Sequence, residues 1–217
     1  MEIIDFSNKN TILNKFVAEL RDVDIQQDSM RFRRNLERFG EIMSYKISKR
    51  LSYEAEEIQT PLGLVNVNIP EKDIVVAAIL NGGTSLADGL RNMFDNCGNA
   101  FVPVKREYID GEGSNVCVES VSSPSLDGKV LIIADAMFAT GQTVLSVYEK
   151  LLQFGTPKAI HLVCAIASKP GIDFIMRSFP VSNTTIWCGA IDPEINNHGF
   201  IVPGMGDASD HCFGANM

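Results

Sequence analysis

The stretch Val130-Leu-Ile-Ile-Ala-Asp-Ala-Met-Phe-Ala-Thr-Gly-Gln-Thr-Val144 joins an apolar run to a turn of small and hydroxyl-bearing residues. A short apolar run without alternation is typical of a parallel strand buried on both faces. This run ends at Asp135, and the loop 139–143 stands before an amphipathic segment that predicts a helix. Such a loop suits an anion, because unpaired N–H groups point outward at a helix start and threonine hydroxyls add donors. The stretch predicts a phosphate-binding loop, and an ordinary strand-to-helix turn with a capping threonine is the alternative.

Further apolar runs and amphipathic segments lie on both sides of this stretch. The apolar runs span residues 74–80, 100–104, 160–167 and 185–190, and the segments that predict helices span 84–95, 143–154 and 171–178. Because strands and helices alternate, we expect an α/β fold with a mostly parallel central sheet flanked by helices. Ligands of such sheets bind beyond the carboxyl ends of the strands, where Asp135 and the loop 139–143 would lie.

The segments before the sheet predict two additions to it. Apolar residues recur at helical spacing from residue 13 to about residue 51, so we interpret residues 1–52 as N-terminal helices. Alternation of valine with asparagine after a Pro-Leu-Gly turn predicts a β-hairpin over 57–70 with one face in water. Residues 108–128 contain three glycines and a Ser-Ser-Pro-Ser cluster, which indicates a mobile loop or a small hairpin. We expect residues 1–217 to form a single domain.

The composition excludes several classes of protein. The 217 residues carry 19 basic and 27 acidic side chains, and the resulting net charge of −8 opposes binding to nucleic acid through its phosphates. The longest apolar run, 74–80, has seven residues, whereas a membrane-spanning helix needs about 20. No cationic leader is visible at the N-terminus, so the cytoplasm is the expected compartment.

Cysteine, histidine and glycine patterns narrow the chemistry further. Five cysteines without a C-x-x-C pair indicate free thiols, and three scattered histidines form no metal-binding signature. We therefore expect no metal site built from protein side chains alone. The chain contains neither the G-x-x-x-x-G-K-[ST] motif nor a complete G-x-G-x-x-G fingerprint, which disfavours a P-loop and a dinucleotide site.

Two longer motifs resemble those of a known family. Asp135-Ala-Met-Phe-Ala-Thr-Gly-Gln-Thr143 is similar to the D-P-M-L-A-T-G-G-[ST] loop of the uracil phosphoribosyltransferase family. Asn196-Asn-His-Gly-Phe-Ile-Val-Pro-Gly-Met-Gly-Asp-Ala-Ser-Asp210, followed by Phe213-Gly214, is similar to its N-x-x-G-Y-I-x-P-G-x-G-D-A-G-D-x-x-F-G tail. Shorter similarities are Thr60-Pro-Leu-Gly63, Ile79-Leu-Asn-Gly-Gly83, Lys105-Arg-Glu107 and Ile191-Asp192. The resemblance extends from about residue 30 to residue 214.

The resemblance implies the type I phosphoribosyltransferase fold and a reaction between two small molecules. A ribose 5-phosphate unit would pass from 5-phosphoribosyl 1-diphosphate to N1 of uracil, giving UMP and diphosphate. Positive charge develops at the anomeric carbon as diphosphate leaves, so orientation and electrostatic stabilisation would supply most of the acceleration. The resemblance also implies Mg²⁺, held mainly by substrate oxygens, and assembly of the chain into a homo-oligomer, a dimer or larger.

The resemblance further implies roles for individual residues. Asp135 would bind the ribose hydroxyls, Arg106 would bind diphosphate, and Asp207 would face ribose and metal-bound water. The other implied contacts are Ala139, Thr140, Gly141, Gln142 and Thr143 for the 5-phosphate, Asn81, Gly82 and Gly83 for the diphosphate region, and Ile201, Gly204, Met205 and Gly206 for uracil.

Several residues depart from the family pattern. Asn81 stands where the family has arginine, and a neutral amide cannot replace a charge-assisted contact. Gln142 and Ser209 replace glycines, which would cost about 1 kcal/mol or more if the backbone there needed a positive φ. The substitution at Asn81 leaves two alternatives open: a non-catalytic sensor that binds uracil or UMP, and a phosphoribosyltransferase with altered base specificity.

Overall fold

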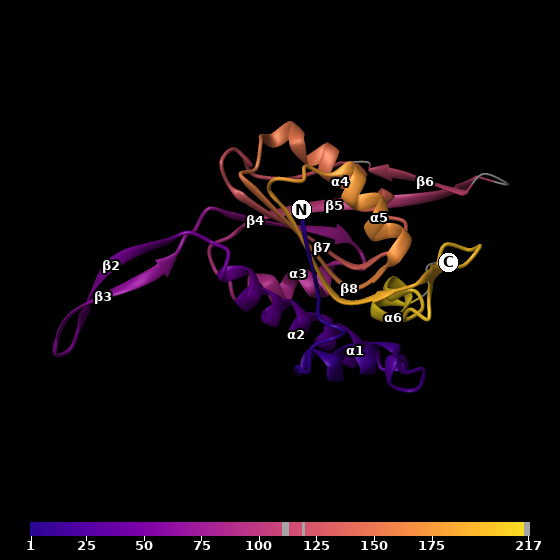
Figure 1. The fold of residues 1–217 in the computed structure, drawn as a ribbon, viewed down its shortest axis with the longest axis horizontal. Coiled ribbons are helices and arrows are strands. Elements are labelled where there is room, and N and C mark those ends of the chain that lie inside the picture. The colour runs from indigo at the N-terminus through magenta and orange to yellow at the C-terminus, as the bar shows by residue number, and fades with distance from the viewer. Residues whose placement is uncertain (110–112, 119, 215–217) are drawn as a thin grey trace.

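The computed structural model describes residues 1–109, 113–118 and 120–214, with side chains throughout except at 105–109 and 113–116. Within these residues a seven-stranded sheet has the order β1-β9-β8-β7-β4-β5-β6 (Figure 1). Its strands are β1 (Glu2–Asp5), β4 (Ile74–Leu80), β5 (Gly98–Ile109), β6 (Gly113–Val118), β7 (Val130–Phe138), β8 (Ala159–Ser168) and β9 (Thr184–Asp192). All neighbouring strands are parallel except β5 and β6. The expected mostly parallel α/β sheet is confirmed.

Helices cover both faces of this sheet. One face packs against α1 (Leu13–Arg21), α2 (Ser29–Ser48) and α3 (Thr84–Arg91), and the other against α4 (Gln142–Leu151) and α5 (Lys169–Ser178). Two single-turn helices, η1 (Ile25–Gln27) and η2 (Leu152–Phe154), join these elements. The last helix, α6 (Ala208–Phe213), packs against α2, and a small pair of strands precedes it, β10 (Glu194–Ile195) and β11 (Ile201–Val202). No helix in the described part of the chain is long and apolar enough to cross a membrane.

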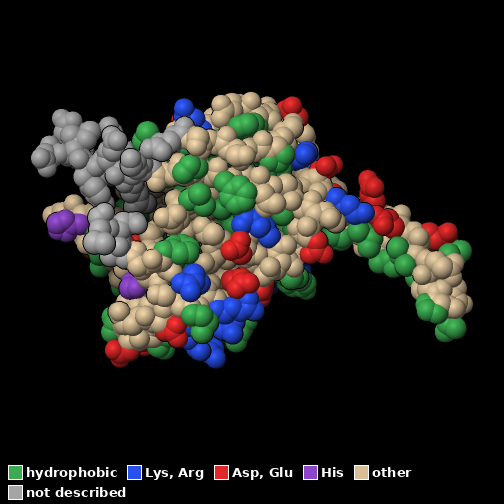
Figure 2. Space-filling model, turned by 180° about the vertical axis from the view of Figure 1, so that it is seen from behind, with side chains coloured by type: hydrophobic (Ala, Val, Ile, Leu, Met, Phe, Trp, Pro, Cys, Tyr) green, Lys and Arg blue, Asp and Glu red, His purple; other side chains and the backbone are tan. Residues whose placement is uncertain are grey.

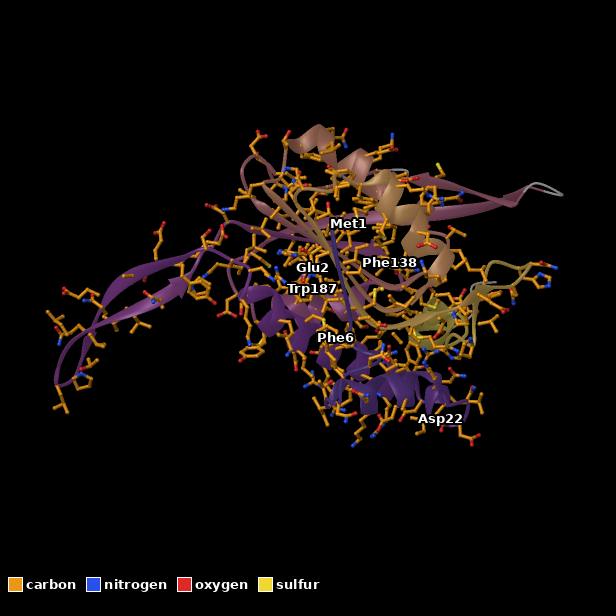
Figure 3. The ribbon with its side chains drawn as sticks, in the orientation of Figure 1. Met1, Glu2, Phe6, Asp22, Phe138 and Trp187 are labelled. Atoms are coloured by element: carbon orange, nitrogen blue, oxygen red, sulfur yellow. The ribbon has the colours of Figure 1, made fainter. Side chains whose placement is uncertain are left out.

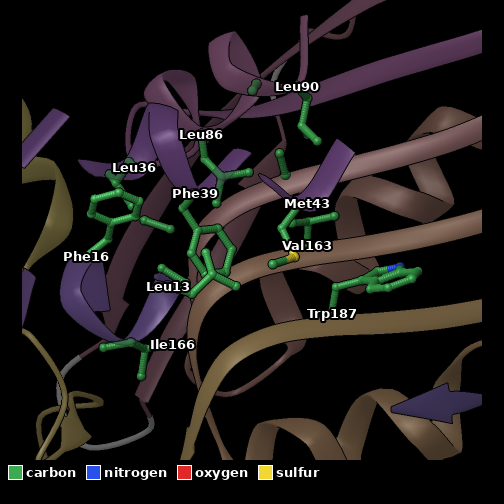
Figure 4. Close-up of a cluster of buried hydrophobic side chains, with 14 of the residues drawn as sticks. Leu13, Phe16, Leu36, Phe39, Met43, Leu86, Leu90, Val163, Ile166 and Trp187 are labelled. Atoms are coloured by element: carbon green, nitrogen blue, oxygen red, sulfur yellow. The ribbon is translucent and has the colours of Figure 1, made fainter. Parts of the chain in front are cut away.

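The core beneath α2 follows from the spacing of its apolar residues. Leu36, Phe39 and Met43 recur on one face of the helix, and each is fully buried. Figure 4 shows these side chains beside Leu86 of α3 and Val163 of β8, which come from distant parts of the chain. Burial of one such side chain stabilises the fold by about 1.5–3 kcal/mol, so this contact fixes α2 against the sheet.

The interpretation of residues 1–52 as N-terminal helices is wrong for the start of the chain, which is not helical. Residues Glu2–Asp5 form β1, an edge strand that pairs in parallel with β9, with Ile3 opposite Ile186. Four residues carry too little periodicity to indicate a strand, and β1 forms because β9 offers unpaired backbone groups at the edge of the sheet. The assignment of residues 1–217 to a single domain stays a prediction.

The hairpin expected over 57–70 forms from β2 (Tyr53–Thr60) and β3 (Gly63–Pro70), so it begins earlier than expected. The expectation that only one of its faces meets water is wrong. Apolar residues such as Ile58, Leu64 and Val65 are exposed, with 39%, 62% and 45% of their surface accessible. Figures 1 and 2 show the reason, because the hairpin projects away from the body as an arm that no other part of the described chain covers.

The segment 108–128 contains the second strand of a small hairpin, β6, which returns antiparallel to β5. Residues 110–112 and 119, on which part of the mobile-loop expectation falls, lie outside the described residues. The end of the segment is packed rather than free, because Leu126 is fully buried and its amide donates to the carbonyl of Phe154. The described residues 108, 109 and 113–118 thus take part in a small hairpin, the alternative to a mobile loop.

Candidate active site

A pocket lies at the carboxyl-terminal edge of the sheet, where β4 and β7 end and α6 begins. Its cavity volume is about 200 Å³, and the cavity opens to solvent. Five of the residues expected in the site line it: Asn81, Gly82, Asp135, Thr143 and Asp207. Asn81 and Asp207 stand more than a hundred positions apart in the chain, and the parallel sheet brings all five residues to one edge.

Asp135, on β7, lines the pocket at this edge of the sheet. Its side chain is largely buried, and one carboxylate oxygen, Oδ1, accepts a hydrogen bond of 2.8 Å from the amide of Ala136. Gly82 passes directly in front of the carboxylate: a β-carbon at position 82 would lie 3.5 Å from Asp135 Oδ1 and 3.5 Å from Ser209 Oγ. Three separate segments of the chain therefore converge on this carboxylate.

Gly83 allows the turn after β4 to press against β7. A β-carbon at position 83 would lie 2.3 Å from the carbonyl oxygen of Ala134 and 2.8 Å from that of Ile79, so a larger residue would displace the turn. Asn81, two residues earlier, is exposed and lines the pocket, and the peptide bond between Leu80 and Asn81 is cis. The turn after β4 therefore presents Asn81 to the pocket, and its role at diphosphate stays a prediction.

The predicted phosphate loop forms the start of α4. Gly141 is the N-cap residue, with a left-handed backbone (φ +79°), and Thr140 Oγ1 accepts a hydrogen bond of 3.3 Å from the amide of Gln142. The first N–H groups of a helix have no partner within the helix, so they are available to an anion. Gln142 is itself the first helical residue, and positive φ occurs only at glycines among the described residues. The strain considered for Gln142 and Ser209 is therefore absent.

A serine from the neighbouring helix fixes the other end of this loop. Ser168 is the N-cap of α5, and its hydroxyl accepts a hydrogen bond of 2.9 Å from the amide of Gly171. The same hydroxyl donates to the carbonyl oxygen of Ala139 over 2.5 Å. Of the predicted loop residues, Thr143 lines the pocket, whereas Ala139, Thr140, Gly141 and Gln142 form the adjoining backbone and do not line it.

Asp207 begins α6 and has a structural role in addition to the one expected of it. Its Oδ1 accepts hydrogen bonds from the amides of Ser209, at 2.8 Å, and Asp210, at 3.3 Å, which caps the helix. All three of these residues line the pocket.

Cys212, also on α6, is buried. Burial raises the pKa of its thiol to about 11, so the side chain packs as a neutral apolar group.

The four residues expected at uracil do not line this pocket. Ile201, Gly204 and Met205 are buried, Gly206 is exposed, and all four lie immediately before Asp207 in the chain. Arg106 is placed only by its backbone, which pairs with Val116 within the β5–β6 hairpin; its side chain lies outside the described residues. The structure thus brings five of the expected site residues to one pocket, and the roles of all the expected site residues stay predictions.

Several pocket residues were not predicted. Ala136 and Met137 follow Asp135, and Ser209 and Asp210 follow Asp207. All four stand inside the two motifs that carry the family resemblance, so the motifs contained the signal that could have found them. Val104 also lines the pocket from β5 and belongs to neither motif.

The pocket offers oxygen donors rather than a complete metal site. Asp135, Asp207 and Asp210 contribute carboxylates, and no cluster of three or more metal-ligating side chains occurs among the described residues. Carboxylate oxygens are hard ligands, and Mg²⁺ commonly keeps water and substrate phosphate oxygens as its remaining ligands. The donor set therefore fits a magnesium ion that arrives with a diphosphate-bearing substrate.

Comparisons with known proteins show the family to which the chain belongs. The family model described as uracil phosphoribosyltransferase matches residues 7–215. The chain is 45% identical to the uracil phosphoribosyltransferase of Porphyromonas gingivalis over 217 residues, which is all of both chains. It is 36% identical over 203 residues to the uracil phosphoribosyltransferase of Pyrobaculum arsenaticum, covering 91% of this chain and 92% of that one.

A solved structure has a fold similar to that of this chain. The AQ2163 protein from Aquifex aeolicus superposes with a TM-score of 0.87 at 27% sequence identity, covering 98% of each chain. The motif spacing, the pocket at the end of β4 and β7, and the full-length relatives lead to the same assignment. The chain belongs to the uracil phosphoribosyltransferase family.

Proposed function

We propose that this protein is an active uracil phosphoribosyltransferase, which forms UMP and diphosphate from uracil and 5-phosphoribosyl 1-diphosphate and so serves pyrimidine salvage. The convergence of Asp135, Thr143 and Asp207 on one pocket carries the proposal. A phosphate-binding helix start, a ribose-binding carboxylate and a second carboxylate are the groups that a phosphoribosyl substrate requires. Membership of the family supports the same reaction.

The loop 139–143 binds the 5-phosphate in this proposal, and Asp135 binds the ribose hydroxyls. Backbone N–H groups at the start of α4 supply the donors, which explains how a chain of net charge −8 accommodates an anionic substrate. The carboxylate of Asp135 is held in place by the amide of Ala136, so little reorganisation is needed when ribose binds. Fixing the ribose in this way sets the anomeric carbon for attack by the base.

The leaving diphosphate lies near Asn81, Gly82 and Gly83, with Arg106 as the cationic partner. Asp207 would face water bound to Mg²⁺, and Mg²⁺ carried mainly by substrate oxygens would neutralise charge on the leaving diphosphate. Asn81 can donate hydrogen bonds from its amide, but it adds no charge. The diphosphate region thus depends more on Arg106 and on backbone groups than a site with arginine at position 81 would.

Uracil is recognised by main-chain groups of the segment 201–206, which contains Ile201, Gly204, Met205 and Gly206. Main-chain donors and acceptors suit the edge of a small planar base, and glycines at 204 and 206 keep side chains out of the way. Both glycines adopt positive φ, +62° and +75°, so the backbone path itself requires them. Base selection then depends on the path of this backbone.

Incubation of the purified protein with labelled uracil, 5-phosphoribosyl 1-diphosphate and Mg²⁺ tests the proposal, and we expect UMP to form. Failure to form UMP while uracil or UMP binds in calorimetry would establish the non-catalytic sensor, the alternative that Asn81 favours. A panel of cytosine, orotate, hypoxanthine and adenine tests altered base specificity. Faster turnover of any of these than of uracil would refute the assignment of substrate.

The projecting hairpin supports a homo-oligomer. Leu62 and Leu64, near its tip, have 100% and 62% of their surface exposed, and a two-stranded hairpin is only marginally stable alone. A second copy of the chain would cover this apolar surface. Light scattering after gel filtration should give at least twice the mass of one chain, and Leu62→Ser with Leu64→Ser should lower it; a wild-type monomer would refute the proposal.

The cytoplasm is the compartment that we propose. All five cysteines are free thiols, including Cys164 and Cys188, whose sulfur atoms lie 3.5 Å apart on neighbouring strands. Thiols this close persist in a reducing environment. Cell fractionation with an antibody to the protein tests the proposal, and recovery in an extracellular fraction would contradict it.

A further inference from the structure

An ion pair links the end of α1 to the end of β9. The guanidinium of Arg21 donates from two nitrogens to the two carboxylate oxygens of Asp192, over 2.7 Å in each case. The side chain of Asp192 is 8% exposed and that of Arg21 is 24% exposed, so the pair is largely shielded from solvent. Paired N–H···O contacts of this kind fix both side chains in direction as well as distance.

The same pair binds both polar backbone groups of Gly204. The amide of Gly204 donates to Asp192 Oδ2 over 2.8 Å, and its carbonyl oxygen accepts a hydrogen bond of 2.8 Å from Arg21. Gly204 stands in a tight turn, because a β-carbon there would lie 2.2 Å from the carbonyl oxygen of Ile201. Arg21 and Asp192 therefore form a clamp, hereafter the Gly204 clamp, on one residue of the segment 201–206.

Other contacts to this part of the chain also come from the N-terminal helices. The guanidinium of Arg33, on α2, donates to the carbonyl oxygen of Cys212 at the end of α6, and the ring of Phe32 lies 5.1 Å from that of His211. Figure 3 shows Asp22, the residue after Arg21, at the end of α1 on the side of the molecule where α6 lies. The segment 201–213 is thus braced by the first two helices.

We propose that Arg21 is a positioning residue for the base: through the Gly204 clamp it sets the backbone of 201–206 in the path that recognises uracil. The inference rests on the proposed function, because that segment recognises the base there. Main-chain recognition leaves no side chain that could reorient to compensate for a shifted peptide group. A misplacement of about 1 Å in such a site can cost about 100-fold in rate.

The chain contains a matched control for the effect of losing an ion pair. Arg31, on α2, donates from two nitrogens to Glu19, at 3.0 and 2.8 Å, and the side chain of Glu19 is 10% exposed. That pair has the same chemistry and a similarly buried carboxylate, and it joins α1 to α2 without touching Gly204. Arg31→Ala therefore measures the cost of a lost ion pair in this region, and Arg21→Ala adds the cost of releasing Gly204.

The experiment compares steady-state kinetics of the wild type, Arg21→Ala, Arg21→Lys and Arg31→Ala. Arg21→Lys keeps a positive charge beside Asp192 but loses the paired geometry. It therefore tests the same contact if Arg21→Ala does not fold. We expect KM for uracil to rise about tenfold or more in both Arg21 variants, with KM for 5-phosphoribosyl 1-diphosphate within about twofold of wild type. Arg31→Ala should leave both constants unchanged.

Hydrogen exchange gives a readout that does not need activity. The amide of Gly204 should exchange faster in Arg21→Lys than in wild type, and at the wild-type rate in Arg31→Ala. An unchanged Gly204 exchange rate, or equal rises in KM for both substrates, would overturn the positioning role. A wild-type protein that makes no UMP would instead refute the proposed function, and the exchange measurement would still decide whether Arg21 orders Gly204.

Discussion

Gly171 lies so close to Ala139 that a β-carbon at position 171 would be 2.1 Å from the carbonyl oxygen of Ala139. The first turn of α5 therefore forms the wall against which the phosphate loop rests. Ser168 reinforces this contact, since its hydroxyl is hydrogen-bonded to both residues. The shape of the loop is set by a helix that does not line the pocket.

Gly171→Ala should disturb the loop although position 171 is outside the pocket. The new methyl group must displace Ala139 or α5, which we expect to cost about 1–3 kcal/mol of unfolding free energy. KM for 5-phosphoribosyl 1-diphosphate should rise because the donors at the start of α4 move. Gly63→Ala is the control, because a β-carbon there meets nothing within 4 Å. A Gly171 variant with wild-type stability and KM would show that the loop does not depend on this contact.

Asp135→Asn should lower kcat/KM by about 100-fold, as expected when a positioned charged group at a reacting centre is lost. The amide keeps the size of the side chain, and its oxygen can still accept from the amide of Ala136, so the thermal midpoint should change little. Steady-state assays and thermal unfolding of the same preparation separate the two effects. Activity that survives the substitution would remove Asp135 from the catalytic residues.

Asn81→Arg should strengthen binding of the diphosphate group. Asn81 is exposed and lines the pocket, so a longer side chain has room, and a guanidinium supplies charge-assisted hydrogen bonds. We expect affinity for diphosphate, measured by calorimetry, to rise about tenfold and to weaken with added salt. Asn81→Gln controls for length without charge. Equal affinities for the Arg and Gln variants would mean that position 81 does not meet the leaving group.

His161 should make the fold sensitive to mild acid. Its side chain is buried, it accepts a hydrogen bond of 3.1 Å from Trp187 Nε1, and burial lowers its pKa to about 4. The unfolded chain takes up this proton near pH 6.5, so the stabilisation is complete above pH 6.5 and is lost as the pH falls towards 4.

Urea unfolding at a series of pH values tests this dependence. His161→Gln removes the titrating group and keeps an acceptor for Trp187, so its stability should vary less between pH 6.5 and 4 than that of the wild type. His198→Gln, at an exposed position, should keep the wild-type slope. Parallel slopes for the wild type and His161→Gln would assign the acid sensitivity to other groups.

The features that the sequence predicts best are local. The run that begins at Val130 contains the strand, the carboxylate and the helix start within fifteen residues, so their order along the chain determines the geometry. Gln142 shows the limit of this reasoning. The positive φ required by the loop falls on Gly141, one residue earlier, and only the backbone shows which position needs it.

Features that depend on distant partners could not be predicted. Glu2–Asp5 becomes a strand because β9 lies beside it, and the apolar residues of β2 and β3 stay exposed because the hairpin leaves the body. Arg21 gave no signal of its own, since arginine at the end of an amphipathic helix is ordinarily a solvated residue. Its partner Asp192 stands 171 residues later, a distance that no local pattern bridges.

The pairing of β1 with β9 and of Arg21 with Asp192 sets the order in which a newly synthesised chain can be completed. A ribosome adds about 5–20 residues per second, so Asp192 is added roughly 9–34 s after Arg21. During that interval the first strand and the end of α1 have no partner. A nascent chain that stops before β9 leaves β1 unpaired, so the last strand of the seven-stranded sheet to be translated is the one that completes this sheet.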